Sequence, residues 1–386
     1  MRGGLPDKAA QAMVAEQRAI AMKPQLQSAA GAAPARVPAE TLPYVPAQVS
    51  RFPELRYMGS KRRLLPWIHQ VLHELDFETA LDPFSGSQSV SYLMKAMGRQ
   101  VVSSDFLNFS ATIGKAIIEN SAMNIDLKAI SILMQNSQDT QNFIQRTFSG
   151  VFFSVDDLRF LDRICANLPR LEEKYQHAVA MSALLRSCVK RQPRGVFTIS
   201  GDLAKYDDGR RDLKLSLEEH FLEQIEAFNQ AIFSNGQRNR ALRDDVFSVD
   251  QREIDLVYLD PPYVPRSDDN CYIKRYHFLE GLSCYWRGMT IHHSTKVKKI
   301  PKKYTPFSYR RTALYAFEQM FERFRKQKIV LSYSSNGYPD LNELISLLER
   351  TKRSIYVFKR DHRYHFGTHG TAKRTQVEEY LIVGLP

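Results

Sequence analysis

Cysteine is scarce in this sequence of 386 residues, and long hydrophobic runs are missing. The four cysteines form no C-x-x-C pair and match no zinc-binding spacing, which excludes a disulfide-rich scaffold. We expect reduced thiols in a cytoplasmic protein. No apolar run is long enough to cross a bilayer, and the N-terminus lacks the charged and apolar stretches of a secretory signal. Membrane insertion and secretion are therefore not expected.

A phosphate-binding loop of the form G-x-x-x-x-G-K-[ST] is also missing, which argues against an ATP-driven enzyme. The histidine intervals match no common zinc motif, so we expect no metal centre. Charge of one sign, in contrast, is in excess, because Lys and Arg number 54, Asp and Glu number 42, and the net charge is +12. A basic chain attracts polyanions, although charge alone does not identify the partner.

The N-terminal segment differs in composition from the rest of the chain. Residues 1–48 are rich in Ala, Gln and Pro, which predicts a flexible tail with one short helix near residues 9–22. Folded structure is expected to begin near Phe52. Beyond it, a helical pattern over residues 62–75 precedes a strand, a Ser-Gly-Ser turn and further helix-strand alternation. This order predicts a doubly wound α/β sheet.

The predicted strands fall into two groups along the chain. They cover residues 79–84, 101–105, 241–247, 255–262, 328–335, 354–362 and 377–384. Between the second and third of them, residues 125–236 carry mostly helical spacing, which we interpret as an inserted helical domain. Residues 49–124 and 237–386 would then form one catalytic domain. Residues 264–305 show little periodicity, and a loop of that length is usually functional or mobile.

The sharpest motif is Asp260-Pro261-Pro262-Tyr263, which directly follows the apolar residues 256–259. It lies at the carboxyl end of a predicted strand, where open α/β sheets bind ligands. An exocyclic amine of a nucleobase is a poor nucleophile, because its lone pair is delocalised into the ring. A carboxylate and a main-chain carbonyl that accept its two hydrogens would draw the nitrogen towards tetrahedral geometry. Prolines stiffen the turn, and the tyrosine can stack on a base taken out of the duplex.

The chemistry that suits this turn is direct methyl transfer from a sulfonium to the amine, driven by positioning and electrostatics. The alternative interpretation is a strand cap with Tyr263 packed in the core. Residues 266–276, which follow the turn, form either a lid on the target pocket or an ordinary surface loop.

With this motif in view, residues 55–384 resemble the Dam-like (D12 class) adenine-N6 DNA methyltransferases. The run Arg56–Lys61 looks like the family motif aromatic-x-Gly-Gly/Ser-Lys, and Asp82–Ser87 looks like its glycine loop. The resemblance implies a Rossmann-like methyltransferase sheet, S-adenosyl-L-methionine as the donor, and adenine in a short specific sequence of double-stranded DNA as the target. It also implies that residues 125–236 contain the target-recognition element.

The same resemblance carries roles over to individual residues. Catalysis would belong to the four residues of the Asp-Pro-Pro-Tyr turn. Cofactor binding would belong to Tyr57, Lys61, Asp82, Phe84, Gly86, Asp105, Asp245 and Val246. Residues 377–382 resemble the closing strand of the family.

Two positions depart from the family pattern. Gln88 stands where the glycine loop normally has a second glycine, and Val246 stands where the family has a phenylalanine that stacks on the donor. These departures favour the alternative of a catalytically silent DNA-binding module. Asp82 and Asp105 each also have a simpler interpretation as helix caps. Cytosine N4 and RNA adenine remain alternative targets, since the chemical problem is the same.

A basic segment follows the catalytic turn, because no acidic residue occurs between Glu280 and Glu318. Its lysines and arginines alternate with aromatic residues, which favours contact with DNA phosphates over a plain solvated loop. The basic and aromatic residues are Tyr285, Trp286, Arg287, Lys296, Lys298, Lys299, Lys302, Lys303, Tyr304, Phe307, Tyr309, Arg310 and Arg311. We expect a bacterial or phage protein that associates with the nucleoid through DNA, and a cognate restriction endonuclease is a plausible partner.

Overall fold

The computed structural model of the protein describes residues 44–136, 141–193, 195–198, 200, 208–264, 271–364 and 375–386. The predicted helix near residues 9–22 lies outside these ranges, as do residues 266–270 of the predicted lid. Described structure begins at Tyr44 and a short 3-10 helix, Ala47–Arg51, slightly before the expected Phe52.

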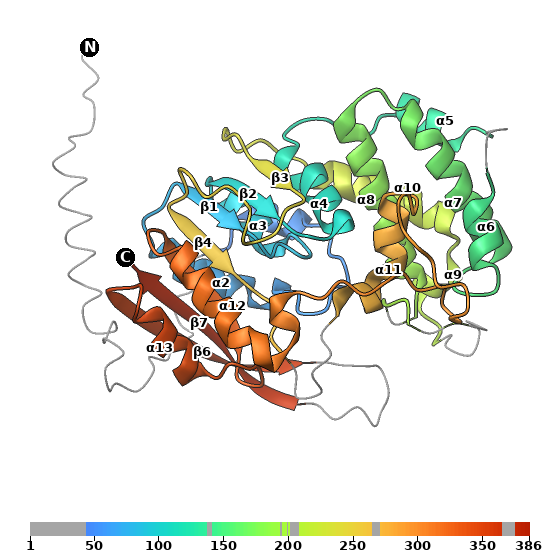
Figure 1. Ribbon diagram of the computed structural model, residues 1–386. Coiled ribbons are helices and arrows are strands. Elements are labelled where there is room, and N and C mark those ends of the chain that lie inside the picture. Colours follow the sequence, from blue (N-terminus) through green and yellow to red (C-terminus); the bar gives the residue numbers. More distant parts are fainter. Residues whose placement is uncertain are drawn as a thin grey trace, which may run out of the picture.

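The core of the fold is a seven-stranded sheet with the order β3-β2-β1-β4-β5-β7-β6 (Figure 1). The first five strands in this order are parallel, and β7 runs antiparallel to both β5 and β6. The strands are β1 (Thr79–Asp82), β2 (Gln100–Ser104), β3 (Arg240–Leu242), β4 (Leu256–Leu259), β5 (Lys328–Ser334), β6 (Ser354–Tyr364) and β7 (Thr375–Leu385). All seven predicted strands are confirmed, and β1, β3 and β4 are shorter than predicted.

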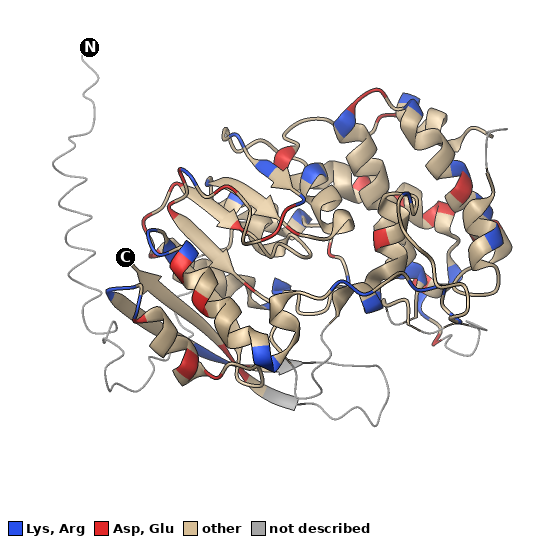
Figure 2. Cartoon of the chain, viewed as in Figure 1, with Lys and Arg blue, Asp and Glu red and all other residues tan. Residues whose placement is uncertain are grey.

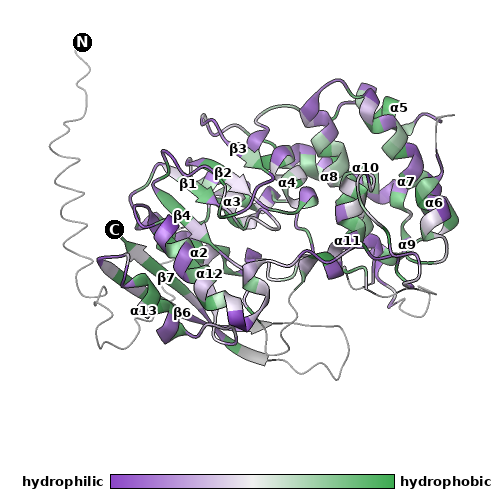
Figure 3. Cartoon of the chain, in the orientation of Figure 1, coloured by the Kyte–Doolittle hydropathy of each residue, from purple (hydrophilic) through white to green (hydrophobic). Residues whose placement is uncertain are grey.

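Helices cover both faces of the sheet, which confirms the doubly wound α/β class. Strand residues alternate between the two cores, so that Ala80 packs with one face and Leu81 with the other. Figure 3 shows the hydrophobic positions along these strands and helices. One face is covered by α2 (Leu65–His73), α3 (Ser89–Ala96) and α4 (Asn108–Gly114), and the other by α12 (Arg310–Arg323) and α13 (Leu341–Leu348). Short 3-10 helices cover Arg62–Leu64, Leu168–Arg170 and Pro306–Ser308, and a π-helix covers Lys115–Glu119.

Residues between β2 and β3 form the helical group that their apolar spacing predicts. These helices lie together beyond the β3 end of the sheet (Figure 1). They are α5 (Leu127–Met134), α6 (Phe143–Phe148), α7 (Val155–Asn167), α8 (Lys174–Arg191), α9 (Arg211–Lys214) and α10 (Leu217–Ala231). Side-chain caps fix several starts, for example Ser216, whose hydroxyl accepts from the Glu219 N–H while Glu219 bonds back. The division into a catalytic domain and a recognition domain stays a prediction.

One expectation is wrong in part, because residues 264–305 are not a loop throughout. Tyr272–Ser283 form helix α11, kinked at Tyr276. All residues from Tyr276 to Leu282 are buried, so the helix has no amphipathic stripe that a sequence pattern could detect. Phe278 lies at the centre of an aromatic cluster with Phe148, Phe152, Phe197 and Trp286. Helix α11 therefore packs against α4 and against α8 of the helical group.

Gly281 is the point of α11 against which Trp286 packs. A Cβ atom at Gly281 would overlap the Trp286 indole nitrogen, and Trp286 is only 5% exposed. In an open helix, Gly to Ala stabilises by about 1 kcal/mol. Here we expect Gly281→Ala to lower the free energy of unfolding by about 1–3 kcal/mol, because the cluster would be overpacked. Urea denaturation measures it, and a stabilised variant would contradict this packing.

Candidate active site

A cavity of about 550 Å³ opens at the carboxyl ends of β1, β2 and β4. This is where the strand order reverses, between β1 and β4, and where doubly wound sheets place their ligands. The structure brings all twelve predicted site residues to its wall. They are Tyr57, Lys61, Asp82, Phe84, Gly86, Asp105, Asp245, Val246, Asp260, Pro261, Pro262 and Tyr263. Their individual roles stay predictions.

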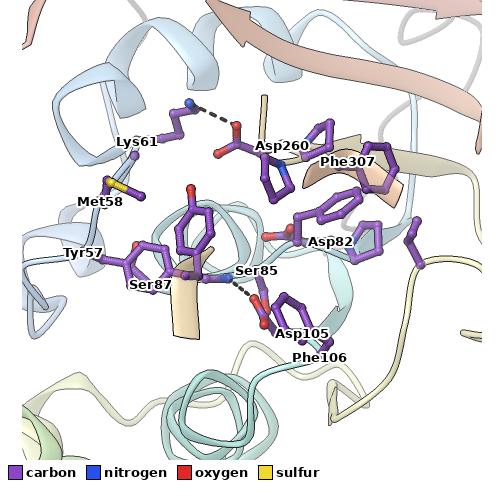
Figure 4. A pocket seen from close by; sticks show the side chains of 18 of the residues that line it. Tyr57, Met58, Lys61, Asp82, Ser85, Ser87, Asp105, Phe106, Asp260 and Phe307 are labelled. Carbon is purple, nitrogen blue, oxygen red and sulfur yellow. Dashed lines mark hydrogen bonds and ion pairs between the residues drawn. The ribbon is translucent and has the colours of Figure 1, made fainter. Parts of the chain in front are cut away.

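Asp260 is the first residue after β4 and forms an ion pair with Lys61. The distance from Lys61 Nζ to Asp260 Oδ1 is 3.0 Å (Figure 4). Lys61 is 3% exposed and also donates a hydrogen bond of 3.3 Å to the Tyr263 hydroxyl. Burial raises the pKa of Asp260 to about 6, and the Lys61 ammonium limits that rise. Lys61, which the family resemblance assigns to the donor, thus contacts the carboxylate of the catalytic turn.

Tyr263 lies at the cavity wall and is half-buried rather than enclosed in the core. Its ring meets the Tyr333 ring edge-on, with 5.0 Å between centroids. Gly337 makes room for it, because a Cβ there would lie 2.8 Å from the Tyr263 Cβ. The interpretation of the turn as a strand cap with a core tyrosine is therefore not supported.

The glycine loop after β1 is held by the carboxylate of Asp105. Asp105 Oδ2 accepts from the Gly86 N–H and Oδ1 accepts from the Leu107 N–H, each at 2.8 Å. Gly86 has a φ of +46°, and a Cβ there would lie 2.9 Å from the Tyr57 ring. Only glycine suits this position, because it tolerates the positive φ and leaves room for the Tyr57 ring. Asp105 is not the N-cap of α4, since Leu107 takes that position.

Gln88 replaces the second glycine of the loop without a change in the expected backbone shape. It adopts a left-handed conformation with a φ of +71° and is fully buried. Its side-chain amide donates to the Ser85 hydroxyl at 2.8 Å and to the Ser110 carbonyl at 3.0 Å. The glutamine therefore takes the backbone shape usually given to glycine and ties the loop to α4.

Tyr57 stacks on two tyrosines of α11 that the sequence analysis did not assign to the site. Its ring lies parallel to Tyr276 at 5.1 Å and faces Tyr272 at 5.6 Å between centroids. The Tyr276 hydroxyl accepts from the Met58 N–H at 2.7 Å. Tyr272 and Tyr276 belong to the first turns of α11, so this part of the predicted lid is a helical wall. Tyrosines four residues apart after the catalytic turn were the only sequence signal for it.

Phe307 supplies the aromatic face that Val246 lacks. It lines the cavity, meets Phe84 edge-on at 5.5 Å, and stacks on Phe247 at 6.0 Å. Val246 itself is buried at the wall, and Asp245 accepts from the Phe247 N–H at 3.0 Å. The sequence interpretation placed Phe307 among DNA-contacting aromatics, whereas the structure places it in the apolar wall of the cavity.

Asp82 is an almost completely buried acid at the cavity wall. Its Oδ2 accepts from the Ser91 hydroxyl at 2.6 Å, whereas its buried Oδ1 has no hydrogen-bond partner among the described residues. Burial raises the pKa of Asp82 to about 7, and burial does the same to Asp105. Five acidic side chains line the cavity, against the two cations Lys61 and Arg275, and this excess of acids favours a cationic ligand.

Comparison with known proteins decides the family. A model of the D12 class N6 adenine-specific DNA methyltransferases matches residues 57–331. The chain belongs to this family. It is a DNA adenine-N6 methyltransferase, and its family implies S-adenosyl-L-methionine as the methyl donor and DNA as the substrate.

Several relatives of this methyltransferase come from bacteria. Type II methyltransferase M2.HphI of Haemophilus parahaemolyticus is 30% identical over 85% of this chain and 97% of its own length. Type II methyltransferase M.FokI of Planomicrobium okeanokoites is 26% identical, and modification methylase StsI of Streptococcus sanguinis is 25% identical, each over 85% of this chain. The chain spans about half the length of these last two proteins, 52% and 51%.

The described residues contain neither a membrane-spanning helix nor a metal-binding cluster. No helix there is long and apolar enough to cross a membrane. Within the same ranges, no three His, Cys, Asp or Glu side chains are grouped so that they could hold a metal ion.

The raised pKa of Asp82 makes the stability of the ligand-free protein depend on pH. Its folded pKa of about 7 lies above the ordinary 3.8, so the folded state binds more protons than the unfolded state between these values. Stability therefore falls as the pH rises from about 4 to about 7. We expect Asp82→Asn to raise the free energy of unfolding at pH 8 by more than about 1 kcal/mol and to have little effect near pH 4. Denaturation at several pH values measures this, and an equal effect at all of them would contradict the assignment.

Proposed function

We propose that the chain methylates adenine N6 within a short specific sequence of double-stranded DNA, after the adenine has left the helix and entered the cavity. The observation that carries the proposal is the Asp-Pro-Pro-Tyr turn at the cavity wall, with one oxygen of Asp260 fixed by Lys61. The other oxygen, Oδ2, has no hydrogen-bond partner among the described residues. It is thus available to accept one hydrogen of the amine.

The turn would supply the remaining contacts to the base. Proline has no N–H of its own, and the rigid ring of Pro261 keeps its carbonyl in place as the second acceptor. Two acceptors at the amine make its nitrogen lone pair available for attack. Tyr263, fixed against Tyr333 and by its bond from Lys61, would stack on the adenine ring. With these roles, positioning of the amine is sufficient for methyl transfer.

The other half of the cavity fits S-adenosyl-L-methionine. Asp82 has a buried carboxylate oxygen without a partner in the described structure, and the surrounding acids suit a positively charged donor. Phe84, Val246 and Phe307 form an apolar wall suited to the donor's adenine ring. When bound, the donor supplies a methyl group on a sulfonium. Gly86 and Tyr57 would fix its approach to the target amine.

DNA would lie along the basic segment that leads into the cavity wall. Thr305, Pro306 and Phe307 line the cavity, and Lys302, Lys303 and Tyr304 directly precede them in the chain. Figure 2 marks lysine and arginine positions in blue along this part of the chain, between α11 and α12. Tyr304 is 50% exposed and packs against Tyr309 at 5.2 Å. Exposed cations next to an exposed aromatic ring suit a phosphate backbone and an adjacent base.

A restriction endonuclease as partner is supported only by the relatives, which are described as type II and modification methylases.

The test of the whole proposal is expression of the chain in a methylation-free bacterium, followed by sequencing that detects modified adenine. We expect N6-methyladenine in one short motif. Unmodified DNA would support the silent-module alternative, and mass spectrometry of the nucleosides would reveal N4-methylcytosine if cytosine were the target.

Asp260→Ala tests the role of the carboxylate. We expect methyl transfer to fall by about 10³-fold, because the amine loses its acceptor, while calorimetry shows donor binding within about twofold of wild type. Asp250→Ala is a matched control, since Asp250 precedes β4 and pairs with Arg252 on the surface. A near-normal rate for Asp260→Ala on duplex DNA would contradict the mechanism.

Lys302 and Lys303 test the position of DNA. Replacing both by Ala should weaken DNA binding and lower the slope of log affinity against log salt by about 2, one for each lost phosphate contact. The matched control is Arg325→Ala with Lys326→Ala, because these exposed cations lie before β5, at the edge of the sheet away from the cavity. Equal slopes for the two double variants would contradict this path for DNA.

A further inference from the structure

A second buried carboxylate, Glu379, lies behind the pair of Lys61 and Asp260. It stands on β7, is 0% exposed, and its Oε2 is 3.8 Å from Lys61 Nζ. Strand β7 runs between β5 and β6, where Glu379 is in register with Ser334 and Arg360. The closing strand was predicted from its apolar pattern, and no role was predicted for the glutamate within it.

The Lys61 ammonium is therefore shared by two carboxylates of unequal exposure. Asp260 is 20% exposed, towards the cavity, and Glu379 is completely enclosed. Lys61 lies 3.0 Å from the first and 3.8 Å from the second. A buried carboxylate is costly unless it is paired, and a hydrophobic residue would fill the same place on β7 without that cost. Its presence next to the catalytic pair calls for a functional account.

We infer that Glu379 is a positioning residue for methyl transfer, which anchors Lys61 and keeps that ammonium from fully neutralising Asp260. The inference rests on the proposed function, in which Asp260 accepts a hydrogen of the target amine. Without Glu379, Lys61 would pair with Asp260 alone, and the Asp260 carboxylate would be a weaker acceptor. With Glu379, one cation holds the geometry of Asp260 while its charge is divided.

The charges around the pair agree with this arrangement. The negative charge of Glu379 raises the pKa of Asp260, in opposition to Lys61. Removing that charge should therefore lower the pKa of Asp260. Among the described residues, the other titratable or charged groups near the pair are Tyr57, Arg63, Asp82, Tyr258, Tyr263, Arg360, His362 and Tyr380. All of them are unchanged in a Glu379 variant, so the shift reports on Glu379.

Glu379→Gln tests the inference, since it removes the charge and keeps the shape. The measurement is the single-turnover rate of methyl transfer to unmethylated genomic DNA as a function of pH. We expect a rate on the plateau about tenfold below wild type. We also expect the acidic limb of the pH–rate profile, near pH 6 in wild type, to move to lower pH by about half a unit or more. Affinity for S-adenosyl-L-methionine should stay within about twofold, because Glu379 is not among the residues that line the cavity.

Glu378→Gln is the matched control on the same strand. Its side chain is 42% exposed and pairs with Lys359, so rate and pH profile should equal those of wild type. If Glu379→Gln does not fold, Glu379→Asp keeps the charge but withdraws it by one methylene. Its acidic limb should shift in the same direction by less.

The possible outcomes distinguish a failure of the Glu379 role from a failure of the proposed function. A Glu379 variant with the wild-type rate and limb would overturn the inference. A lower rate with an unmoved limb would overturn it as well, because that is the effect of a purely structural residue. A wild-type chain that transfers no methyl group to DNA would overturn the proposed function and, with it, this inference.

Discussion

The site depends on one constraint, the confinement of several acidic side chains in one cavity at the carboxyl ends of parallel strands, where Lys61 pairs with Asp260. Because β1, β2 and β4 are parallel neighbours or near neighbours, the acids at their carboxyl ends must share one cavity. Burial favours their protonated forms, and Lys61 is the cation that opposes it at Asp260. The ligand-free cavity thus has an electrostatic cost that a positively charged donor would relieve.

The same constraint explains why residues distant in sequence share the site. The motif with Lys61 comes before β1, the catalytic turn follows β4, and Glu379 comes from the last strand, yet the three meet at one ammonium. On the opposite side of the cavity, α11 stacks two tyrosines on Tyr57 and continues into the aromatic cluster of the helical group. Helix α11 therefore connects Tyr57 at the cavity wall with the aromatic cluster of the helical group.

Sequence patterns predicted most of the fold and the location of the site for identifiable reasons. Strand periodicity and the Asp-Pro-Pro-Tyr turn are local features, so the seven strands and the position of the catalytic-turn candidate could be predicted from them. The other cavity residues were predicted from the resemblance to the family motifs. Helix α11 could not, because it is buried on nearly all sides and shows no amphipathic period. Phe307 and Glu379 could not be assigned to the site either, since only the packing of the 3-10 helix Pro306–Ser308 and of β7 against distant elements brings them there. Gln88 departs from the family pattern in sequence, but its side chain and left-handed backbone preserve the loop.

The most direct test of this account is a crystal structure of the chain with its target duplex and S-adenosylhomocysteine. The account predicts an adenine outside the helix, with N6 within hydrogen-bond distance of Asp260 Oδ2 and the Pro261 carbonyl, while Lys61 stays on Oδ1. A complex in which the adenine amine lies away from Asp260, or in which Asp260 turns both oxygens to Lys61, would contradict it.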